Sequence, residues 1–395
     1  MNTRKIFIVP FLLGIGLAGI YLWKQKDITT YRNNVAQNGK NNPMSLVTDA
    51  LLFKQQKKYQ EAYKKIRLAI ELAPNNHGLH LLRKQIEQKL GKEKWEHYFK
   101  QENLTNKNPL KNKTVLIYAA DWGLGDAFQL MRYARLTKKL GANIILEVAL
   151  KPLIPLLSLC PYIDTIITPT DSQPYADFYI AMTDMPELCK NMLSLLEMHS
   201  PYLQAEKSLE KYWHTIITKN SGFSIGICWE GNTQYHRRRC IPLELLTSLA
   251  ENTGIHLYSL QVGQCTKDIA TLSHKNLIES FNKDFDKSHG CFMDTAAVMK
   301  SLDLAITIDT SIAHLAGALG VPVWIMLAKN AEWRWQENPD LSGWAPNYPS
   351  MRLFRQAKEG EWAPVIQEIR NCLPSFMEKK RPSGKTLYSM SNPCI

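Results

Sequence analysis

A regular alternation of apolar runs with amphipathic segments begins at Lys113, and it constrains the fold of this chain more than any other feature. The clearest unit is Leu304–Ile308, Ile312–Leu319 and Val323–Met326, a pattern that predicts a strand, a helix and a strand. Continuous apolar runs of this length are typical of parallel strands with both faces buried. The sequence therefore predicts an α/β protein with parallel sheets.

The remaining apolar runs fall into two successive sets, because the pattern restarts near residue 223. The further expected strands are Thr114–Ala119, Ile144–Val148, Thr165–Ile167, Phe178–Ala181, Phe223–Trp229 and Ile255–Leu260. Two such sets predict two doubly wound sheets with a cleft between them. We expect an N-terminal domain over 111–215, a C-terminal domain over 216–375 and a flexible tail over 376–395.

An apolar stretch of 18 residues without charge, Ile6–Trp23, lies near the N-terminus. As a helix it would span about 27 Å, close to the thickness of a bilayer core. Lys and Arg flank it on both sides, and no A-x-A-like cleavage site follows. We expect an uncleaved anchor over 1–26; a cleaved signal peptide is the alternative.

The positive charge is concentrated behind that stretch. Residues 1–110 hold 19 Lys and Arg against 8 Asp and Glu, whereas the remaining residues hold 29 against 28. Basic residues beside a membrane segment favour anionic headgroups, and nothing after residue 110 resembles a nucleic-acid module. Two Lys/Arg precede the stretch and four closely follow it, which predicts a single-pass membrane protein with its body in the cytoplasm.

Between anchor and strands we expect a polar linker over 27–42 and a helical module over 43–110. Five residues fall at the offsets of a tetratricopeptide repeat: Tyr59, Ala62, Ile66, Ala69 and Pro74. A further pair of helices is expected from His77 to about Gln101. One repeat is too short for a free-standing solenoid, so an ordinary helical hairpin is the alternative.

The eight cysteines do not form a metal or disulfide motif. None lies before residue 160, and no two have C-x-x-C spacing. We expect reduced, mostly buried thiols.

A glycine-rich turn, Gly123-Leu124-Gly125-Asp126, follows the first expected strand. Glycines allow a ligand to approach the backbone closely, and open α/β sheets bind ligands at this edge. Asp126 would then lie at a helix start beside the ligand. The alternative is that Asp126 only caps the helix.

A second turn, Asp309-Thr310-Ser311, joins the strand–helix unit at the start of its helix. Two hydroxyls and the free N–H groups of a helix start are suited to phosphate, and His314 follows within the first turn. A capped helix without ligand is the alternative.

Two further segments combine arginine with glycine or aromatic residues. Trp229-Glu230-Gly231-Asn232 precedes Arg237-Arg238-Arg239, and arginines can clamp a diphosphate. Trp333-Arg334-Trp335, Trp344 and Met351–Arg355 could line a cleft. A solvated loop and ordinary packing are the respective alternatives.

Together these residues carry a family resemblance. The runs from Asp294 to Gly320 and on to Gln356, with Gly123–Tyr133 and Trp229–Asn232, resemble tetratricopeptide-linked glycosyltransferases. These are related to the bacterial ADP-heptose:lipopolysaccharide heptosyltransferases. The resemblance covers roughly 113–373. The loop from Thr233 to Cys240 departs from the family's central motif, since it is shorter and lacks an acidic residue.

The resemblance implies a GT-B fold, two Rossmann-like domains, with a nucleotide diphospho-sugar bound mainly by the second and transferred without a metal or other cofactor. Asp126 would be the general base. The implied donor-binding residues are Gly125, Gly231, Asn232, Arg239, Gln261, Asp309, Thr310, Ser311 and His314. Arg239 would neutralise the leaving diphosphate, and Gln261 would lie near the nucleoside. The acceptor would be a protein or a lipid-linked glycan. The alternative is a non-catalytic, membrane-anchored scaffold that binds a protein partner through the helical module.

Overall fold

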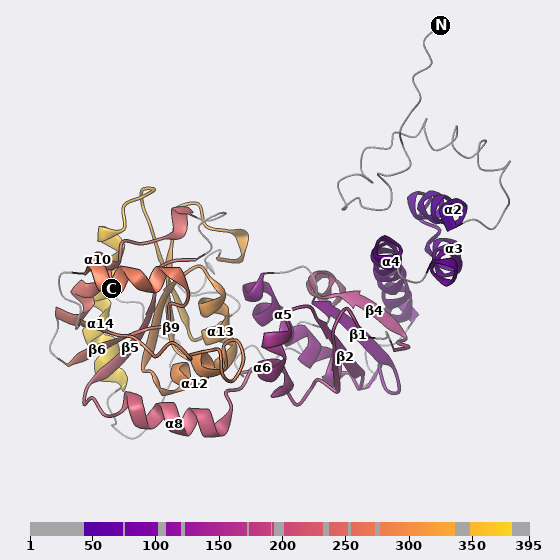
Figure 1. Cartoon of the computed structure of the whole chain (residues 1–395). Coiled ribbons are helices and arrows are strands. Elements are labelled where there is room, and N and C mark those ends of the chain that lie inside the picture. Colours follow the sequence, from indigo (N-terminus) through magenta and orange to yellow (C-terminus); the bar gives the residue numbers. More distant parts are fainter. Residues whose placement is uncertain are drawn as a thin grey trace, which may run out of the picture. The chain divides into compact units, whose positions relative to one another are not determined.

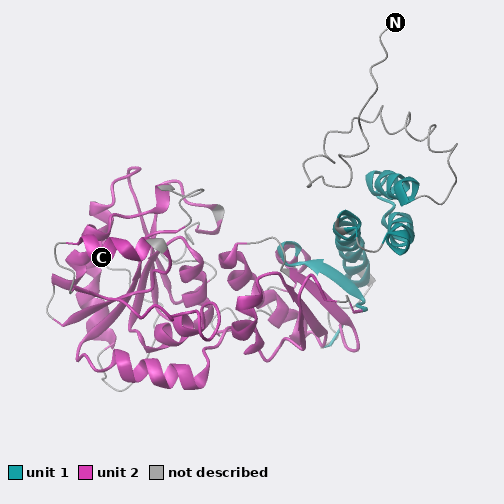
Figure 2. Ribbon diagram, viewed as in Figure 1, with its two compact units in different colours: residues 1–109, 175–184 teal, residues 110–174, 185–395 magenta. Residues whose placement is uncertain are grey.

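The computed structural model describes residues 43–73, 76–101, 108–119, 123–171, 174–190, 192, 201–231, 237–251, 254–272, 277–335 and 348–380. The chain forms two compact units (Figure 2). Unit 1 comprises residues 1–109 and 175–184, and unit 2 comprises residues 110–174 and 185–395.

Unit 1 is mainly helical. Its elements are α2 (Pro43–Gln55), α3 (Tyr59–Leu72), α4 (His77–Gln101), β4 (Phe178–Ala181) and η3 (Met182–Asp184). Helices α2 and α3 form the expected hairpin, and the small side chains of Ala50, Ala62 and Ala69 are fully buried between them. Alanine at such positions allows two helix backbones to approach closely. That the hairpin is a tetratricopeptide unit stays a prediction.

The expected helix pair after His77 is instead one continuous helix, α4, so that prediction was wrong. Gly91, within α4, serves packing, because a Cβ there would lie 2.0 Å from the backbone oxygen of Tyr179 in β4. Trp95 of α4 meets the ring of Phe178 edge-on, with centroids 5.4 Å apart. These contacts draw 175–184 into unit 1, although the sequence placed it in the domain over 111–215.

The first parallel strands of unit 2 are β1 (Thr114–Ala119), β2 (Asn143–Val148) and β3 (Thr165–Ile167). They run in the order β3-β2-β1, with Leu116 opposite Ile145. Helix α5 (Leu124–Lys139) connects β1 to β2. The expected α/β fold with parallel strands is confirmed here.

The second sheet of unit 2 has six parallel strands in the order β10-β9-β8-β5-β6-β7. Its strands are β5 (Phe223–Cys228), β6 (Ile255–Ser259), β7 (Ile278–Glu279), β8 (Leu304–Ile308), β9 (Val323–Leu327) and β10 (Met351–Arg355). The chain winds outward from β5 in one direction and from β8 in the other. The order therefore reverses between β5 and β8, which is where open α/β sheets bind ligands, beyond the carboxyl ends of the strands.

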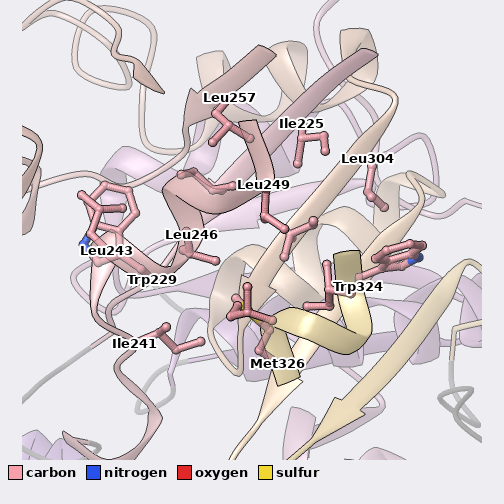
Figure 3. Packing of buried hydrophobic residues seen from close by; sticks show 14 of the residues in the cluster. Ile225, Trp229, Ile241, Leu243, Leu246, Leu249, Leu257, Leu304, Trp324 and Met326 are labelled. Carbon is pink, nitrogen blue, oxygen red and sulfur yellow. The ribbon is translucent and has the colours of Figure 1, made fainter. Parts of the chain in front are cut away.

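Helices cover this sheet (Figure 1). The helical elements of unit 2 besides α5 are η2 (Lys151–Leu153), α6 (Ile154–Ser158), α7 (Met185–Leu188), α8 (Lys207–Ile217), η5 (Arg237–Arg239), α10 (Leu243–Thr247), η6 (Ser248–Glu251), η7 (Gln264–Lys267), α11 (Asp268–Thr271), α12 (Met293–Ser301), α13 (Ser311–Leu319), η9 (Trp333–Trp335) and α14 (Ala363–Lys380). A core cluster of buried hydrophobic residues joins α10 and α14 to the sheet; Figure 3 shows Leu243, Leu246 and Trp324 within it. Its apolar residues exclude water from the sheet, which is the main stabilising term in folding.

Two expected domain boundaries, at 215 and at 376, differ from the structure, and the N-terminal ones lie outside the described residues. Helix α8 crosses the expected domain boundary at 215, because Trp213 donates a hydrogen bond to the buried Asp294 of α12 at 2.9 Å. Helix α14 continues to Lys380, since Phe376 and Met377 pack on the core, so 376–380 is not tail. The expected anchor over 1–26 and linker over 27–42 lie outside the described residues.

Among the helices that the structure describes, none is long and apolar enough to cross a membrane.

Candidate functional site

The reversal point of the large sheet lies beside the start of α13. Strand β8 ends at Ile308, Asp309 follows, and Thr310 is the N-cap, whose hydroxyl accepts a hydrogen bond from the backbone N–H of Ile312 at 3.2 Å. The Thr310 hydroxyl therefore has a structural role in capping the helix. Ser311 is the first helical residue, and its side chain is partly exposed. The start of α13 thus offers a helix dipole and a hydroxyl at the edge where ligands bind.

Two arginines and three carboxylates form an alternating chain at this edge. Arg239 Nη1 lies 2.9 Å from Asp309 Oδ2, and Arg239 Nη2 lies 2.6 Å from Glu332 Oε1. The other oxygen of Glu332 pairs with Arg334, whose Nη2 in turn donates to Asp126 Oδ1. We call these five side chains the acid–arginine chain. It connects the first turn of α5 to the turn after β8.

Burial and charge act differently on the carboxylates of this chain. The side chain of Asp309 is 9% exposed, and burial raises its pKa, although Arg239 opposes the shift. Burial also acts to raise the pKa of Glu332, but the hydrogen bond from Arg239 and the charge of Arg334 outweigh it, so the pKa lies below its usual value. Glu332 therefore stays ionised and holds both guanidinium groups.

Asp126 is not the N-cap of α5, so that alternative is wrong. The N-cap is Gly123, which has no capping side chain, and Asp126 is the third helical residue. A carboxylate in the first turn is favoured by the helix dipole. Its side chain is 29% exposed, with Oδ1 paired to Arg334. Asp126 is thus held in place and still reachable from solvent.

Gly125 serves the close approach of α5 to α13. A Cβ at this position would lie 2.9 Å from His314 Cδ2 and 3.6 Å from the Cα of Ser311. Any larger residue would push the two helix starts apart. Gly125 therefore allows Asp126 to lie near the start of α13; that it also binds the donor stays a prediction.

His314 is buried and neutral. Its ring stacks on Trp335 with centroids 4.9 Å apart, and its Nδ1 lies 3.1 Å from the hydroxyl of Tyr348. Burial, with the charges of Arg334, Arg132 and Arg239, lowers its pKa from 6.5 to about 3. A neutral His314 can offer an anion a hydrogen bond but no positive charge.

Two arginines of η5, Arg238 and Arg239, have described side chains, and these two make different contacts. Arg239 enters the acid–arginine chain, whereas Arg238 is 79% exposed and pairs with Glu359 at 3.2 Å. The side chain of Arg237 lies outside the described residues, as does Asn232. Of these two described side chains, Arg239 is the one that joins the acid–arginine chain; its role toward a donor stays a prediction.

Gly231 lies in the turn after β5, and the side chain of Gln261, which follows β6, contacts that turn. Gln261 Oε1 accepts from the backbone N–H groups of Trp229 and Glu230 at 3.2 and 3.1 Å, and its Nε2 donates to the Glu230 oxygen at 3.0 Å. The side chain of Gln261 thus stabilises the shape of this turn; that it lies near a bound nucleoside stays a prediction. Gly231 is uncrowded, because a Cβ there would lie 3.8 Å from the nearest atom.

Two members of the chain were not among the expected site residues. Arg334 was noted only as a cleft-lining residue between two tryptophans, and Glu332 had no sequence signal at all. Arg334 Nε also contacts Gln129 Oε1 at 3.2 Å. The Trp-Arg-Trp run was the one available indication, since it placed a cation among aromatic residues.

Among the described residues, no group of three or more His, Cys, Asp or Glu side chains is arranged to hold a metal ion.

Comparison with known proteins gives distant likenesses. No protein-family model matches the chain. Protein FlbA of Caulobacter vibrioides is 24% identical over 204 residues, which cover 51% of this chain and 33% of that protein. The match thus spans about a third of that curated relative.

Two solved structures are also similar to the chain. The ADP-heptose LPS heptosyltransferase II of E. coli has a TM-score of 0.49 and 14% identity, covering 68% of this chain and all of that one. The glycosyl transferase family 9 structure from Veillonella parvula has a TM-score of 0.46 and 12% identity, covering 68% of this chain and 97% of that one. The residues of the site, rather than these likenesses, carry the functional assignment.

Proposed function

We propose that this chain is a heptosyltransferase-like glycosyltransferase that moves a sugar from a nucleoside diphospho-sugar to an acceptor hydroxyl. One observation carries the proposal: Asp126, two arginines and the start of α13 meet at the edge of the sheets. A carboxylate beside an anion site is the arrangement that such a transfer requires, because one group accepts a proton while the other receives a leaving diphosphate.

The donor diphosphate would bind at the start of α13. The positive end of α13 and the hydroxyl of Ser311 would attract and bind it, and Arg239 supplies a fixed positive charge next to them. Neutral His314 adds a hydrogen bond through Nε2. The proposal involves no metal or other cofactor, since these groups supply the charge stabilisation that the leaving group needs.

In the transfer step Asp126 accepts the proton of the acceptor hydroxyl. The acceptor oxygen forms a bond to the anomeric carbon of the sugar while the bond from that carbon to the diphosphate oxygen breaks. The electron pair of that bond leaves with the nucleoside diphosphate. Arg239 and the positive end of α13 stabilise the developing negative charge.

The setting of the reaction is part of the proposal. The apolar stretch over 6–23 would anchor the protein, and the flanking basic residues would keep the catalytic body in the cytoplasm. The helical module, read as tetratricopeptide-like, would then hold the acceptor, a protein or a lipid-linked glycan. Nucleic acid is not among the proposed partners.

Nucleotide binding is the first test. The thermal midpoint of the full chain would be followed against ADP, UDP, GDP and CDP and their sugars. A ligand present at about 100 times its Kd stabilises the folded state by about 2.7 kcal/mol, which raises the midpoint. We expect one nucleotide class to do so. A folded chain that responds to none of them would refute the proposal and favour the non-catalytic scaffold.

Turnover by Asp126→Asn is the second test. The release of nucleoside diphosphate from the identified donor, with water as acceptor, would be measured by chromatography. Loss of a general base costs about 10²- to 10⁴-fold in rate, so we expect turnover to fall by that factor while nucleotide binding persists. Glu361→Gln, which removes an exposed carboxylate paired with Lys358, is the matched control. Wild-type turnover by Asp126→Asn would contradict the role of Asp126.

A further inference from the structure

Arg334, in the short helix η9, contacts both Asp126, the proposed base, and Glu332, the carboxylate that also binds Arg239 of the proposed diphosphate site. Its Nη2 donates to Asp126, the proposed base, and its Nη1 to Glu332, while its Nε contacts Gln129 Oε1 at 3.2 Å. Asp126 and Gln129 belong to α5, whereas Arg334 lies 208 residues further along the chain. Arg334 uses one lone pair of Asp126 Oδ1 and so competes with an acceptor hydroxyl for that oxygen.

Glu332 places Arg334 next to the proposed diphosphate site. One carboxylate oxygen of Glu332 binds Arg239 at 2.6 Å and the other binds Arg334, so both guanidinium groups meet on a single carboxylate. Arg239 also reaches Asp309, directly before the start of α13. A diphosphate bound at α13 therefore lies close to Arg239 and within the field of Arg334.

The charge balance of the acid–arginine chain shows what a diphosphate would change. Three carboxylates share two arginines, and the diphosphate would add further negative charge. Guanidinium pairs with phosphate oxygens bidentately, so the diphosphate competes with the carboxylates for arginine. Glu332 is held by both arginines and Asp309 is buried. Asp126 is bound by one arginine of the chain and is 29% exposed, so water can solvate it once that arginine leaves.

We propose that Arg334 is a donor-responsive positioning residue, which pairs with Asp126 in the free protein and moves to the diphosphate when the donor binds. The move frees Asp126 to accept the proton of the acceptor hydroxyl. The base is thereby released only when the donor is present, which orders donor binding before the transfer step. This inference rests on the proposed function, because it needs a diphosphate at α13.

Competition for Arg334 has a thermodynamic signature. If Asp126 holds Arg334 back from the diphosphate, then Asp126→Asn makes nucleotide binding tighter. Because the ion pair between Asp126 and Arg334 is partly exposed, its removal should lower the Kd for nucleotide by about 2- to 5-fold. Removing the arginine by Arg334→Gln should weaken binding about 10-fold, since a charge-assisted hydrogen bond to phosphate is lost.

The experiment is a double-mutant cycle on the full chain. Titration calorimetry would measure the Kd of whichever of ADP, UDP, GDP and CDP stabilises the wild type, for the wild type, both single variants and the double variant. We expect Asp126→Asn to tighten binding in the wild-type background and to change it by less than about 2-fold in the Arg334→Gln background. A merely structural role for Arg334 would not produce this dependence.

A simpler cause, direct repulsion between Asp126 and the diphosphate, gives a different result. Repulsion would make the gain from Asp126→Asn at least as large without Arg334, because an unpaired carboxylate repels more strongly. That result would overturn the inference, as would tightening that is absent in both backgrounds. Nucleotide binding by the wild type would in both cases leave the proposed function standing, whereas a folded wild type that binds none of the four refutes both.

Two further variants serve as a control and as a substitute for Arg334→Gln. Arg370→Gln removes an arginine of α14 that pairs with Glu251 at 3.0 Å, and it should leave the Kd unchanged. Should Arg334→Gln fail to fold, Arg334→Lys keeps the charge without the planar fork. With lysine we expect weaker nucleotide binding than in the wild type and a smaller, still measurable gain from Asp126→Asn; an undiminished gain would count against the exchange.

Discussion

Replacement of Gly125 by alanine tests whether the two helix starts of the site are held together as the structure shows. The new Cβ would lie 2.9 Å from His314 Cδ2, closer than the Cβ atoms of real proteins approach a neighbouring atom. His314 cannot move away easily, because it is 4% exposed, stacks on Trp335 and contacts the hydroxyl of Tyr348. The strain must therefore be taken up by a shift between α5 and α13.

The magnitude follows from two opposing terms. Overpacking a tight site costs about 1–3 kcal/mol, whereas alanine in place of glycine within a helix gains about 0.5–1 kcal/mol. The net destabilisation is about 0.5–2 kcal/mol. In domains of this size each kcal/mol lowers the thermal midpoint by about 2–4 °C, so we expect a decrease of about 1–8 °C.

Gly231→Ala is the matched control, because the sequence predicted both glycines to bind the donor. Its Cβ would lie 3.8 Å from Ile308 Cδ1, an ordinary contact, so its midpoint should stay close to that of the wild type. Scanning calorimetry of both variants, with the nucleotide Kd measured alongside, checks the prediction. Gly125→Ala with the stability and nucleotide affinity of the wild type would refute the packing role of Gly125.

Three further outcomes follow from other contacts. Gly91→Ala would place a Cβ 2.0 Å from the backbone oxygen of Tyr179, so unit 1 should lose at least about 2 kcal/mol in chemical denaturation followed by helical circular dichroism; unchanged stability would contradict the packing of α4 on β4. His314 has a folded pKa of about 3, below its unfolded value, so its contribution to stability is present above pH 6.5 and is lost as the pH falls toward 3. Between pH 6 and 4 the free energy of unfolding of the wild type should therefore fall by about 1 kcal/mol per pH unit more than that of His314→Phe. Denaturant titration at each pH measures the difference. Gln261→Ala leaves two backbone N–H groups of the turn after β5 without their side-chain acceptor, so it should destabilise unit 2 by about 1–3 kcal/mol in the same assay, and stability like that of the wild type would show that the turn holds its shape without Gln261.

The fold of unit 2 was predictable to the extent that it depends on local pattern. The apolar runs that form β1, β5 and β8 are buried on both faces. A strand with two buried faces has apolar residues at consecutive positions, and this pattern is visible in the sequence. The start of α13 was predictable for the same reason, since a residue such as Thr310 before an apolar helix signals an N-cap. Asp126 and Arg239 could be placed at the sheet edge because each follows a recognisable strand and turn.

What only the tertiary structure decided depends on partners far away in the chain. The sequence predicted two helices between His77 and Gln101, but the structure has one helix, in which Gly91 approaches Tyr179, 88 residues later. His314 looked like a phosphate ligand, and its burial against Trp335 and Tyr348 made it neutral. The pairing of Asp126 with Arg334 spans 208 residues. Local sequence fixes backbone propensity and hydrophobic period, whereas burial and charge pairing are set by contacts that exist only after the chain has folded.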